Sequence, residues 1–278
     1  ASSLVGSEMC IRDRLKDYME AFNQPNALIE LEEGNYANTG FTQWGASGLA
    51  VAWAEENTRE SIFKAFKRKE TFATTGTRIA LRFFAGYDLQ TIDLDSDNLV
   101  SQAYSKAVTM GSDLMHDENK SPDFLVWAQR DKNGAALQRV QIVKGWIDMG
   151  SGTPYEKVFD VACSDGMNVD PETNRCPDNG ARVNINDCSI SQDVGAAELK
   201  SYWNDPEFDP NVKSFYYVRV LENPSCRWST WDAVKAGFKP REDIHDTIQE
   251  RAWSSPIWYI PAVNEYSVIP LGGTVAID

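Results

Sequence analysis

The chain has few of the side chains on which metal or hydrolytic chemistry depends. It contains two histidines, His116 and His245, and neither belongs to a His-x-His pair. A transition-metal centre needs several nitrogen, sulfur or carboxylate ligands, which two isolated imidazoles do not supply. Residues 253–256 include two serines but lack the flanking glycines of a nucleophile elbow. We therefore expect neither a metal cluster nor a serine–histidine triad in this chain.

The cysteines carry a clearer signal. Cys163, Cys176 and Cys188 lie in a stretch rich in Asp, Asn, Gly and Pro, and Cys226 follows later. An even number of cysteines among turn residues is typical of disulfides and an oxidising compartment, so we expect a periplasmic or secreted protein. Free buried thiols are the alternative, and a zinc site is disfavoured because no CxxC pair occurs.

The position of each cysteine suggests a pairing. Cys163 ends a predicted strand and Cys176 lies in the loop just after it, which favours a Cys163–Cys176 bridge. Cys188 and Cys226 would then pair. The two other pairings remain possible, because spacing alone does not exclude them.

Two groups of aspartates have the residue types of a calcium site. Asp93, Asp95 and Asp97 alternate as in a calcium loop, but Asn98 stands where the glycine belongs and Tyr104 where the bidentate glutamate belongs. A second group lies in the cysteine-rich stretch and contains Asp165, Asp170 and Asp178. Asp is a common turn residue, so we interpret both groups as solvated loop carboxylates.

Arginines and tryptophans gather near the C-terminus and form a candidate binding surface. The main candidates are Arg227, Trp228 and Arg251, and the further members are Trp231, Glu250, Trp253 and Trp258. Such a cluster could bind a glycan or a protein partner. The alternative, which we favour, is a sandwich core in which arginine stacks on indole and pairs with a carboxylate.

Composition excludes some function classes. The chain has 278 residues, a net charge of −14 and 42% hydrophobic residues, which is enough for a substantial core. A strongly acidic surface repels phosphate groups, so we expect no nucleic-acid partner. No stretch is long and apolar enough for a membrane span.

Residues 1–14 have a separate origin in our interpretation. Ten of them, from Leu4 to Asp13, match the translation of one reading frame of a sequencing adapter. We expect the natural sequence to begin near Leu15, as part of a longer reading frame, and residues 1–14 to contribute almost nothing to stability.

The first predicted elements form a strand-to-helix unit of an α/β domain. A short helix is expected at 15–22 and a buried strand at 48–54. A second helix would start at the N-cap Asn57, with Glu60 at the capping-box position. Ile62, Phe63 and Phe66 would form its single apolar face.

After residue 70 the pattern changes to short strands, which indicate a sandwich of antiparallel sheets. We expect strands at 72–75, 79–84, 124–128, 140–147, 155–163, 215–221 and 255–260. The turn signal at 131–134 predicts a hairpin between the strands at 124–128 and 140–147. Two helices are expected, at 196–203 and 231–236.

Several blocks of the sequence resemble a bacterial family known as domain of unknown function 3604. The matching blocks keep their order and occupy residues 48–49, 51–60, 68–79, 124–128, 141–146, 215–222, 227–233 and 248–259. That family resembles the PHP superfamily of metal-dependent phosphoesterases, whose distorted (β/α) barrel holds its metals through His and Asp near the strand ends.

Together with the adapter match and the strand pattern, the resemblance predicts an α+β architecture with four parts. Residues 1–14 would be the adapter artefact, 15–70 the C-terminal remnant of a PHP-like barrel, 71–262 a β-sandwich and 263–278 a tail. Glu55 and Arg59 would then lie at the rim of the barrel's active-site face. Helix-start electrostatics is the alternative explanation for both.

Two hypotheses for function follow. In the first, the chain is the C-terminal fragment of a PHP-like metal-dependent hydrolase or phosphoesterase. The divalent metal would then bind residues before Leu15, and this chain would hold no cofactor and be inactive. In the second, the sandwich is a non-catalytic module that binds a glycan or protein partner or supports the barrel.

Overall fold

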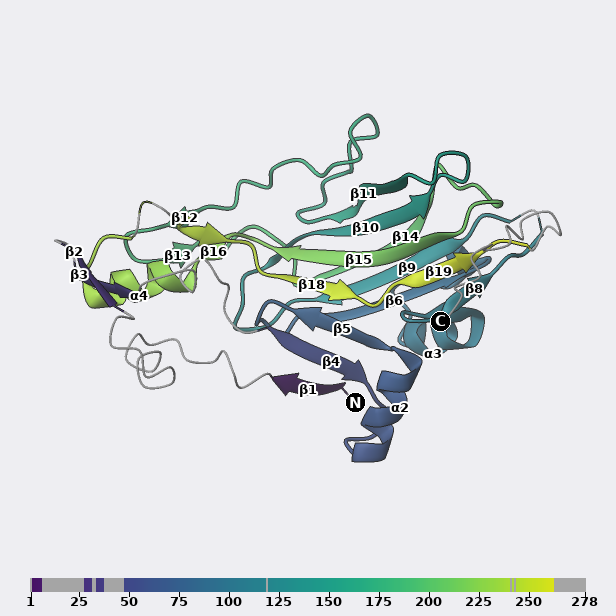
Figure 1. Ribbon diagram of the computed structural model, residues 1–278, viewed down its shortest axis with the longest axis horizontal. Helices are drawn as coiled ribbons and strands as arrows, with labels where there is room; N and C mark the ends of the chain where they lie inside the picture. Colours follow the sequence, from purple (N-terminus) through teal and green to yellow (C-terminus); the bar gives the residue numbers. More distant parts are fainter. Residues whose placement is uncertain are drawn as a thin grey trace, which may run out of the picture.

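Two antiparallel sheets dominate the structure, a computed structural model (Figure 1). The described residues are 2–6, 28–31, 34–37, 48–118, 120–240, 242 and 244–262, and in the first three segments only the backbone is described. Within them, three α-helices accompany the sheets, so the chain has a β-rich α+β fold. No helix in the described part is long and apolar enough to cross a membrane.

The larger sheet runs in the order β1-β4-β5-β18-β15-β10-β11, and β19 and β8 extend it beside β15. Its strands are β1 (Ser2–Gly6), β4 (Leu49–Trp53), β5 (Thr71–Thr74), β8 (Asp113–Met115), β10 (Leu137–Ile147), β11 (Pro154–Cys163), β15 (Ser214–Glu222), β18 (Arg251–Ser254) and β19 (Ile257–Ile260). All its pairs are antiparallel except β8 with β19.

The smaller sheet runs in the order β14-β9-β6-β7. Its strands are β6 (Ala80–Gly86), β7 (Ala107–Thr109), β9 (Asp123–Gln129) and β14 (Glu198–Asn204). Three two-stranded ribbons lie outside the two sheets: β2 (Leu28–Leu31) with β3 (Gly34–Ala37), β12 (Val183–Asn184) with β13 (Ser189–Ile190), and β16 (Ser225–Cys226) with β17 (Thr247–Ile248). The helices are α2 (Arg59–Arg68), the 3-10 turn η3 (Leu89–Thr91), α3 (Leu99–Lys106) and α4 (Trp228–Ala236).

One apolar core joins the two sheets. Leu81 and Phe83 of β6 pack in the same buried cluster as Val140 of β10 and Val218 of β15. The predicted alternation at 79–84 is confirmed, since Ile79, Leu81 and Phe83 are buried in this cluster. Phe84 points the other way and packs with Leu89 and Leu99 under η3 and α3.

The predicted hairpin between 124–128 and 140–147 is wrong. β9 pairs with β6 and β14 in the smaller sheet, whereas β10 pairs with β11 and β15 in the larger one. The turn at 131–134 therefore carries the chain from one sheet to the other. Both strands are almost continuously buried, and their local sequence does not specify which neighbour each strand pairs with.

The helix predicted at 196–203 is also wrong, because Glu198–Asn204 forms β14. Leu199 and Trp203 pack on the core between the sheets, while Tyr202 packs with the cluster under α3. This alternation has a period of two, which suits a strand. The helix predicted at 231–236 is confirmed as part of α4, and the predicted helix at 15–22 lies outside the described residues.

The strand and helix predicted at 48–70 exist as β4 and α2, but they do not form a parallel strand–helix unit. β4 pairs antiparallel with both β1 and β5. The predicted domain boundary after residue 70 thus falls between α2 and β5. β4 and β5 lie on either side of this boundary, yet they pair in the same sheet. The N-cap of α2 is Thr58 and not the expected Asn57. Thr58 Oγ1 accepts a hydrogen bond from the Ser61 amide at 3.2 Å.

Candidate functional site

The turn between β4 and α2 presents the two rim candidates to solvent. Glu55 and Arg59 are both exposed. The Glu55 carboxylate forms an ion pair with Arg68 at 3.6 Å, and Arg59 is the first residue of α2. Because Arg68 is the last residue of α2, this ion pair is not the helix-start effect considered above. Both that explanation and a role in substrate binding stay predictions.

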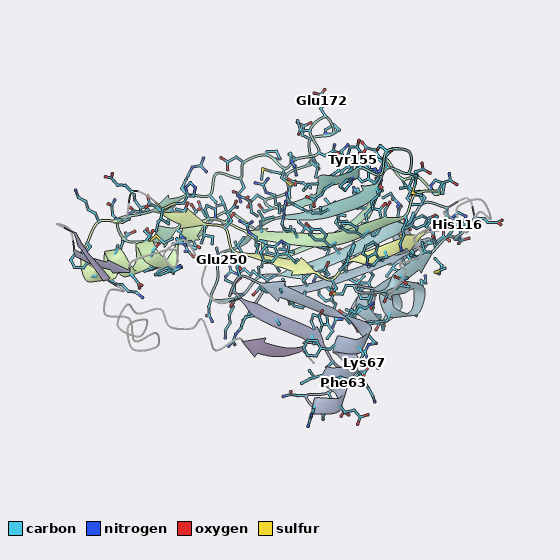
Figure 2. The ribbon with its side chains drawn as sticks, in the orientation of Figure 1. Phe63, Lys67, His116, Tyr155, Glu172 and Glu250 are labelled. Atoms are coloured by element: carbon cyan, nitrogen blue, oxygen red, sulfur yellow. A yellow bond between two sulfur atoms is a disulfide. The ribbon has the colours of Figure 1, made fainter. Side chains whose placement is uncertain are left out.

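The α2 helix presents most of its apolar face to solvent. It buries Ser61 and Ala65 beside β4. Phe63 and Phe66 are 60% and 44% exposed, and together with Ile62 they line a shallow hollow. Figure 2 shows Phe63 and Lys67 on the side of α2 away from the sheets. The prediction that these residues form one apolar face is correct, but the described part of the chain does not cover that face.

The residues of the arginine–tryptophan cluster do not converge on one surface. Trp228 and Trp231 belong to α4, at one end of the long axis in Figure 1. Trp258 lies on β19, where its ring packs 5.1 Å from that of Phe215. The four tryptophans therefore do not form a single platform.

Each main candidate instead has a local stacking partner. Arg227 is 6% exposed and lies over the Trp228 ring at 5.3 Å. Arg251 lies over Trp253 at 5.9 Å, and its amide donates to Thr75 Oγ1 at 2.9 Å. The arginine–indole stacking agrees with one part of the core interpretation, but none of the four tryptophans belongs to the core between the two sheets. A binding role for this cluster stays a prediction.

The cysteines pair as predicted. Cys163 bonds to Cys176 and Cys188 to Cys226, with Cα atoms 5.6 and 5.5 Å apart. The first disulfide fastens the loop after β11 to its own strand. The second connects that loop to β16.

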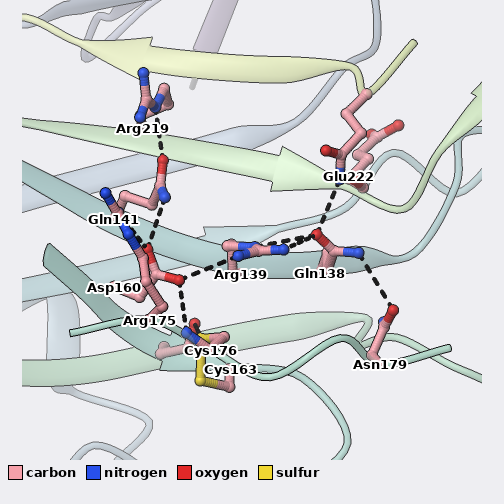
Figure 3. A network of polar contacts seen from close by, with 12 residues as sticks. Gln138, Arg139, Gln141, Asp160, Cys163, Arg175, Cys176, Asn179, Arg219 and Glu222 are labelled. Carbon is pink, nitrogen blue, oxygen red and sulfur yellow. Dashed lines mark hydrogen bonds and ion pairs between the residues drawn. A yellow bond between two sulfur atoms is a disulfide. The ribbon is translucent and has the colours of Figure 1, made fainter. Parts of the chain in front are cut away.

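A buried carboxylate organises the region beside the first disulfide (Figure 3). Asp160 on β11 has a fully buried side chain, and it accepts hydrogen bonds from Arg139, Gln141, Arg175 and the Cys176 amide. Because all these donors are protein groups, we interpret the network as structural support for the disulfide loop.

The aspartates with calcium-like spacing occupy ordinary turns. Asp93, Asp95 and Asp97 are exposed between η3 and α3. Asp165 accepts a hydrogen bond from the Gly195 amide at 2.8 Å, and Asp170 from the Glu172 amide at 2.9 Å. Asp178 forms an ion pair with Arg182 at 2.9 Å. These contacts agree with the turn interpretation.

A cleft at His116 was not expected from the sequence. The cleft has a volume of about 440 Å³ and is lined by His116, Glu118, Lys120, Ser121, Phe208, Pro210, Asn211 and Ala262. The Tyr259 hydroxyl donates to Pro210 O at 3.0 Å and lies 2.7 Å from His116 Nδ1. Because this hydroxyl has a single hydrogen, His116 Nδ1 must be the donor in their contact. In the neutral ring, Nε2 is then left as an acceptor.

A second group consists of two acids, the buried Glu222 and the partly buried Glu250, and the sequence analysis did not bring them together. Glu222 is 1% exposed, and burial raises its pKa to about 7, with further increases from the charges of Glu250 and Asp131. Burial also raises the pKa of Glu250. Neither carboxylate forms an ion pair within the described part of the chain.

No group of three or more His, Cys, Asp or Glu side chains in the described residues is arranged to hold a metal ion. The fold and its sites thus define a disulfide-linked, two-sheet β-protein. The chain belongs to the family described as "Protein of unknown function (DUF3604)", whose model matches residues 13–261. No curated protein and no solved structure matches the chain.

Proposed function

We propose that this chain is the C-terminal part of a PHP-like, metal-dependent hydrolase or phosphoesterase whose catalytic metal binds residues outside this sequence. The sandwich would support the catalytic domain without taking part in the chemistry. The proposal rests on the family membership, on the resemblance to the PHP superfamily, and above all on the exposed apolar face of α2.

Burying a phenylalanine side chain stabilises a protein by about 1.5–3 kcal/mol, so a helix seldom leaves two of them in water without reason. Phe63 and Phe66 lie one helical turn apart, on the side of α2 opposite Ser61 and Ala65. A neighbouring domain that covered this side would complete the burial of α2. β4 pairs antiparallel with β5. We therefore place the contact between the two domains on α2, and this contact does not require β4 to be a parallel strand.

The expected chemistry is attack of a metal-activated water on a phosphate or related ester. Among the described residues, Glu55 and Arg59 are the candidates to lie near such a centre, because Glu55 precedes α2 and Arg59 begins it. Their exposure leaves both available to a substrate at the domain boundary. The two disulfides support a periplasmic or secreted location for the whole protein.

The rival function is a binding module, and the cleft at His116 is the observation that favours it. The cleft combines an aromatic ring, Phe208, with polar side chains of both charge signs, as expected for a small polar ligand. Recovery of the upstream reading frame distinguishes the two functions. A His-x-His motif with an Asp–His pair at strand ends supports the hydrolase, and their absence favours the binding module.

A labelling experiment tests the α2 contact directly. Phe63→Cys, in a Cys10→Ser background, should react with a maleimide in the present chain and be protected in the longer protein. Tyr155→Cys is the matched control, because Tyr155 is 49% exposed on β11, on the opposite side of the molecule (Figure 2). Equal reactivity of Phe63→Cys in both proteins, with Tyr155→Cys unchanged, would refute the contact.

A further inference from the structure

Three buried oxygen atoms without a hydrogen-bond partner gather in one corner of the sandwich. They are Thr77 Oγ1, Glu222 Oε1 and Glu250 Oε2, and they are the full set of such side-chain atoms in the described part of the chain. Burial raises the pKa of Glu222, the nearby Thr77 side chain lowers it, and the charge of Glu250 raises it further, so all three side chains lie close together. Buried polar atoms in folded proteins nearly always have a partner, so three neighbouring exceptions require an explanation.

The backbone fixes this corner through contacts between separate segments. The Glu222 amide donates to the Glu250 carbonyl oxygen at 2.9 Å, and the Thr75 amide donates to the Arg251 carbonyl oxygen at 3.0 Å. The turn at 131–134 closes the corner from the other side. A Cβ atom on Gly134 would lie only 3.0 Å from Glu222 Oε1, so this glycine allows the turn to approach the carboxylate.

The neighbouring charged side chains, Arg251 and Asp131, have other hydrogen-bond partners. Arg251 donates from Nε to the Gln249 carbonyl oxygen and stacks on Trp253. The Asp131 carboxylate accepts hydrogen bonds from the Arg78 and Asn133 amides, so it is not free to join the two glutamates. Burial is the largest influence on Glu222 and Glu250 and raises the pKa of both. The charge of Arg251 lowers the pKa of Glu250, but neither glutamate forms an ion pair in the described part of the chain. Their ionised forms are therefore costly without a bound cation.

We propose that this corner is a binding site for a single Ca²⁺ ion, with Glu222, Glu250 and Thr77 as side-chain ligands. The donor set contains only oxygen, which suits Ca²⁺ and disfavours zinc, iron and copper. Backbone carbonyl groups and water would complete the six to eight ligands that Ca²⁺ takes. One cation would give all three oxygens a partner.

The site would connect the β5–β6 turn, the end of β15 and the segment before β18. It does not depend on the proposed hydrolase function, because these residues all belong to the described sandwich. Calcium sites in extracellular modules have dissociation constants of about 0.1–1 mM, and the disulfides fit such an environment. We expect an affinity in this range.

Isothermal titration calorimetry of the intact, EDTA-treated chain with CaCl2 at pH 8 tests the proposal. One Ca²⁺ per chain is expected, together with a rise in Tm of a few degrees when the ion exceeds its Kd tenfold. Glu222→Gln, Glu250→Gln and Thr77→Val should each weaken binding at least tenfold. Asp95→Asn is the matched control and should change nothing, because Asp95 is an exposed carboxylate in another acidic loop.

Two results would overturn the proposal. One is the absence of both a heat of binding and a Tm shift in the wild-type chain at up to 10 mM CaCl2. This test does not depend on the folding of any variant. The other is binding that persists unchanged in Glu222→Gln and Glu250→Gln. If CaCl2 has no effect while Glu222→Gln raises Tm at pH 8, the two acids share a proton and the calcium site does not exist.

Discussion

Glu222 and Glu250 are joined through their backbones, since the amide of the first donates to the carbonyl oxygen of the second at 2.9 Å. This hydrogen bond connects the end of β15, where Glu222 lies, to the segment before β18, where Glu250 lies. Their proximity makes the charge of this corner, and therefore the stability of the sandwich, dependent on pH.

We predict that the cation-free chain loses stability as the pH rises from 5 to 8. Glu222 has a folded-state pKa of about 7, raised by burial above its ordinary value of 4.5. An acid with a raised folded-state pKa contributes its full stability below the unfolded-state pKa, and this contribution is lost as the pH passes through the folded-state pKa. The loss should be of the order of a few kcal/mol.

Urea denaturation in EDTA at several pH values measures this effect. Glu222→Gln should flatten the profile between pH 5 and 8, whereas the exposed Glu156→Gln should leave it unchanged. Identical profiles for the wild type and Glu222→Gln would show that Glu222 is already ionised in the folded chain at pH 5.

The close packing of Phe215 on Gly145 gives a second prediction. A Cβ atom at position 145 would lie 2.1 Å from Phe215 Cζ, so Gly145→Ala must displace the ring. We expect a loss of about 1–3 kcal/mol in the free energy of unfolding. Gly150→Ala is the control, since its nearest neighbour would be Asp148 Oδ1 at 3.4 Å. Equal losses for the two variants would contradict this packing.

The disulfides give a third prediction. Replacing Cys163 and Cys176 by serine should cost about 3 kcal/mol, and replacing Cys188 and Cys226 about 4 kcal/mol, because the second ring is longer. Thiol titration of the denatured, unreduced chain should detect one free thiol, Cys10, among the five cysteines. Detection of three or more would show that at least one bridge is absent.

The apolar face of α2 gives a fourth prediction. Phe63→Ala should change the stability of this chain by less than about 0.5 kcal/mol, because the ring is 60% exposed. In the longer protein the same change should cost about 2–4 kcal/mol if a neighbouring domain buries the ring. Small effects in both proteins would argue against a covered helix.

Local patterns in the sequence predicted most strands and both disulfides. The alternation of Ile79, Leu81 and Phe83 identifies the buried face of β6, because side chains two residues apart share a face. Cys163 and Cys176 could be paired because a strand end and the following loop are close along the chain. These features depend on neighbours in the sequence.

The errors concern contacts between distant segments. Nothing in β9 or β10 encodes that they belong to different sheets, since both strands are almost continuously buried. Ala196 and Ala197 gave the segment before β14 a helical composition, and the seven-residue pairing with β9 overrides it. The corner formed by Thr77, Glu222 and Glu250 has no sequence motif, because each residue comes from a different loop or strand end.

Elemental analysis tests the central claim most directly. The present chain and the longer protein would be purified in parallel, and their zinc, manganese and iron contents measured beside hydrolysis of p-nitrophenyl phosphate. We predict no stoichiometric transition metal and no hydrolysis for this chain, and both for the longer protein. One tightly bound zinc, manganese or iron ion per molecule of this chain, or none in the longer protein, would contradict the account.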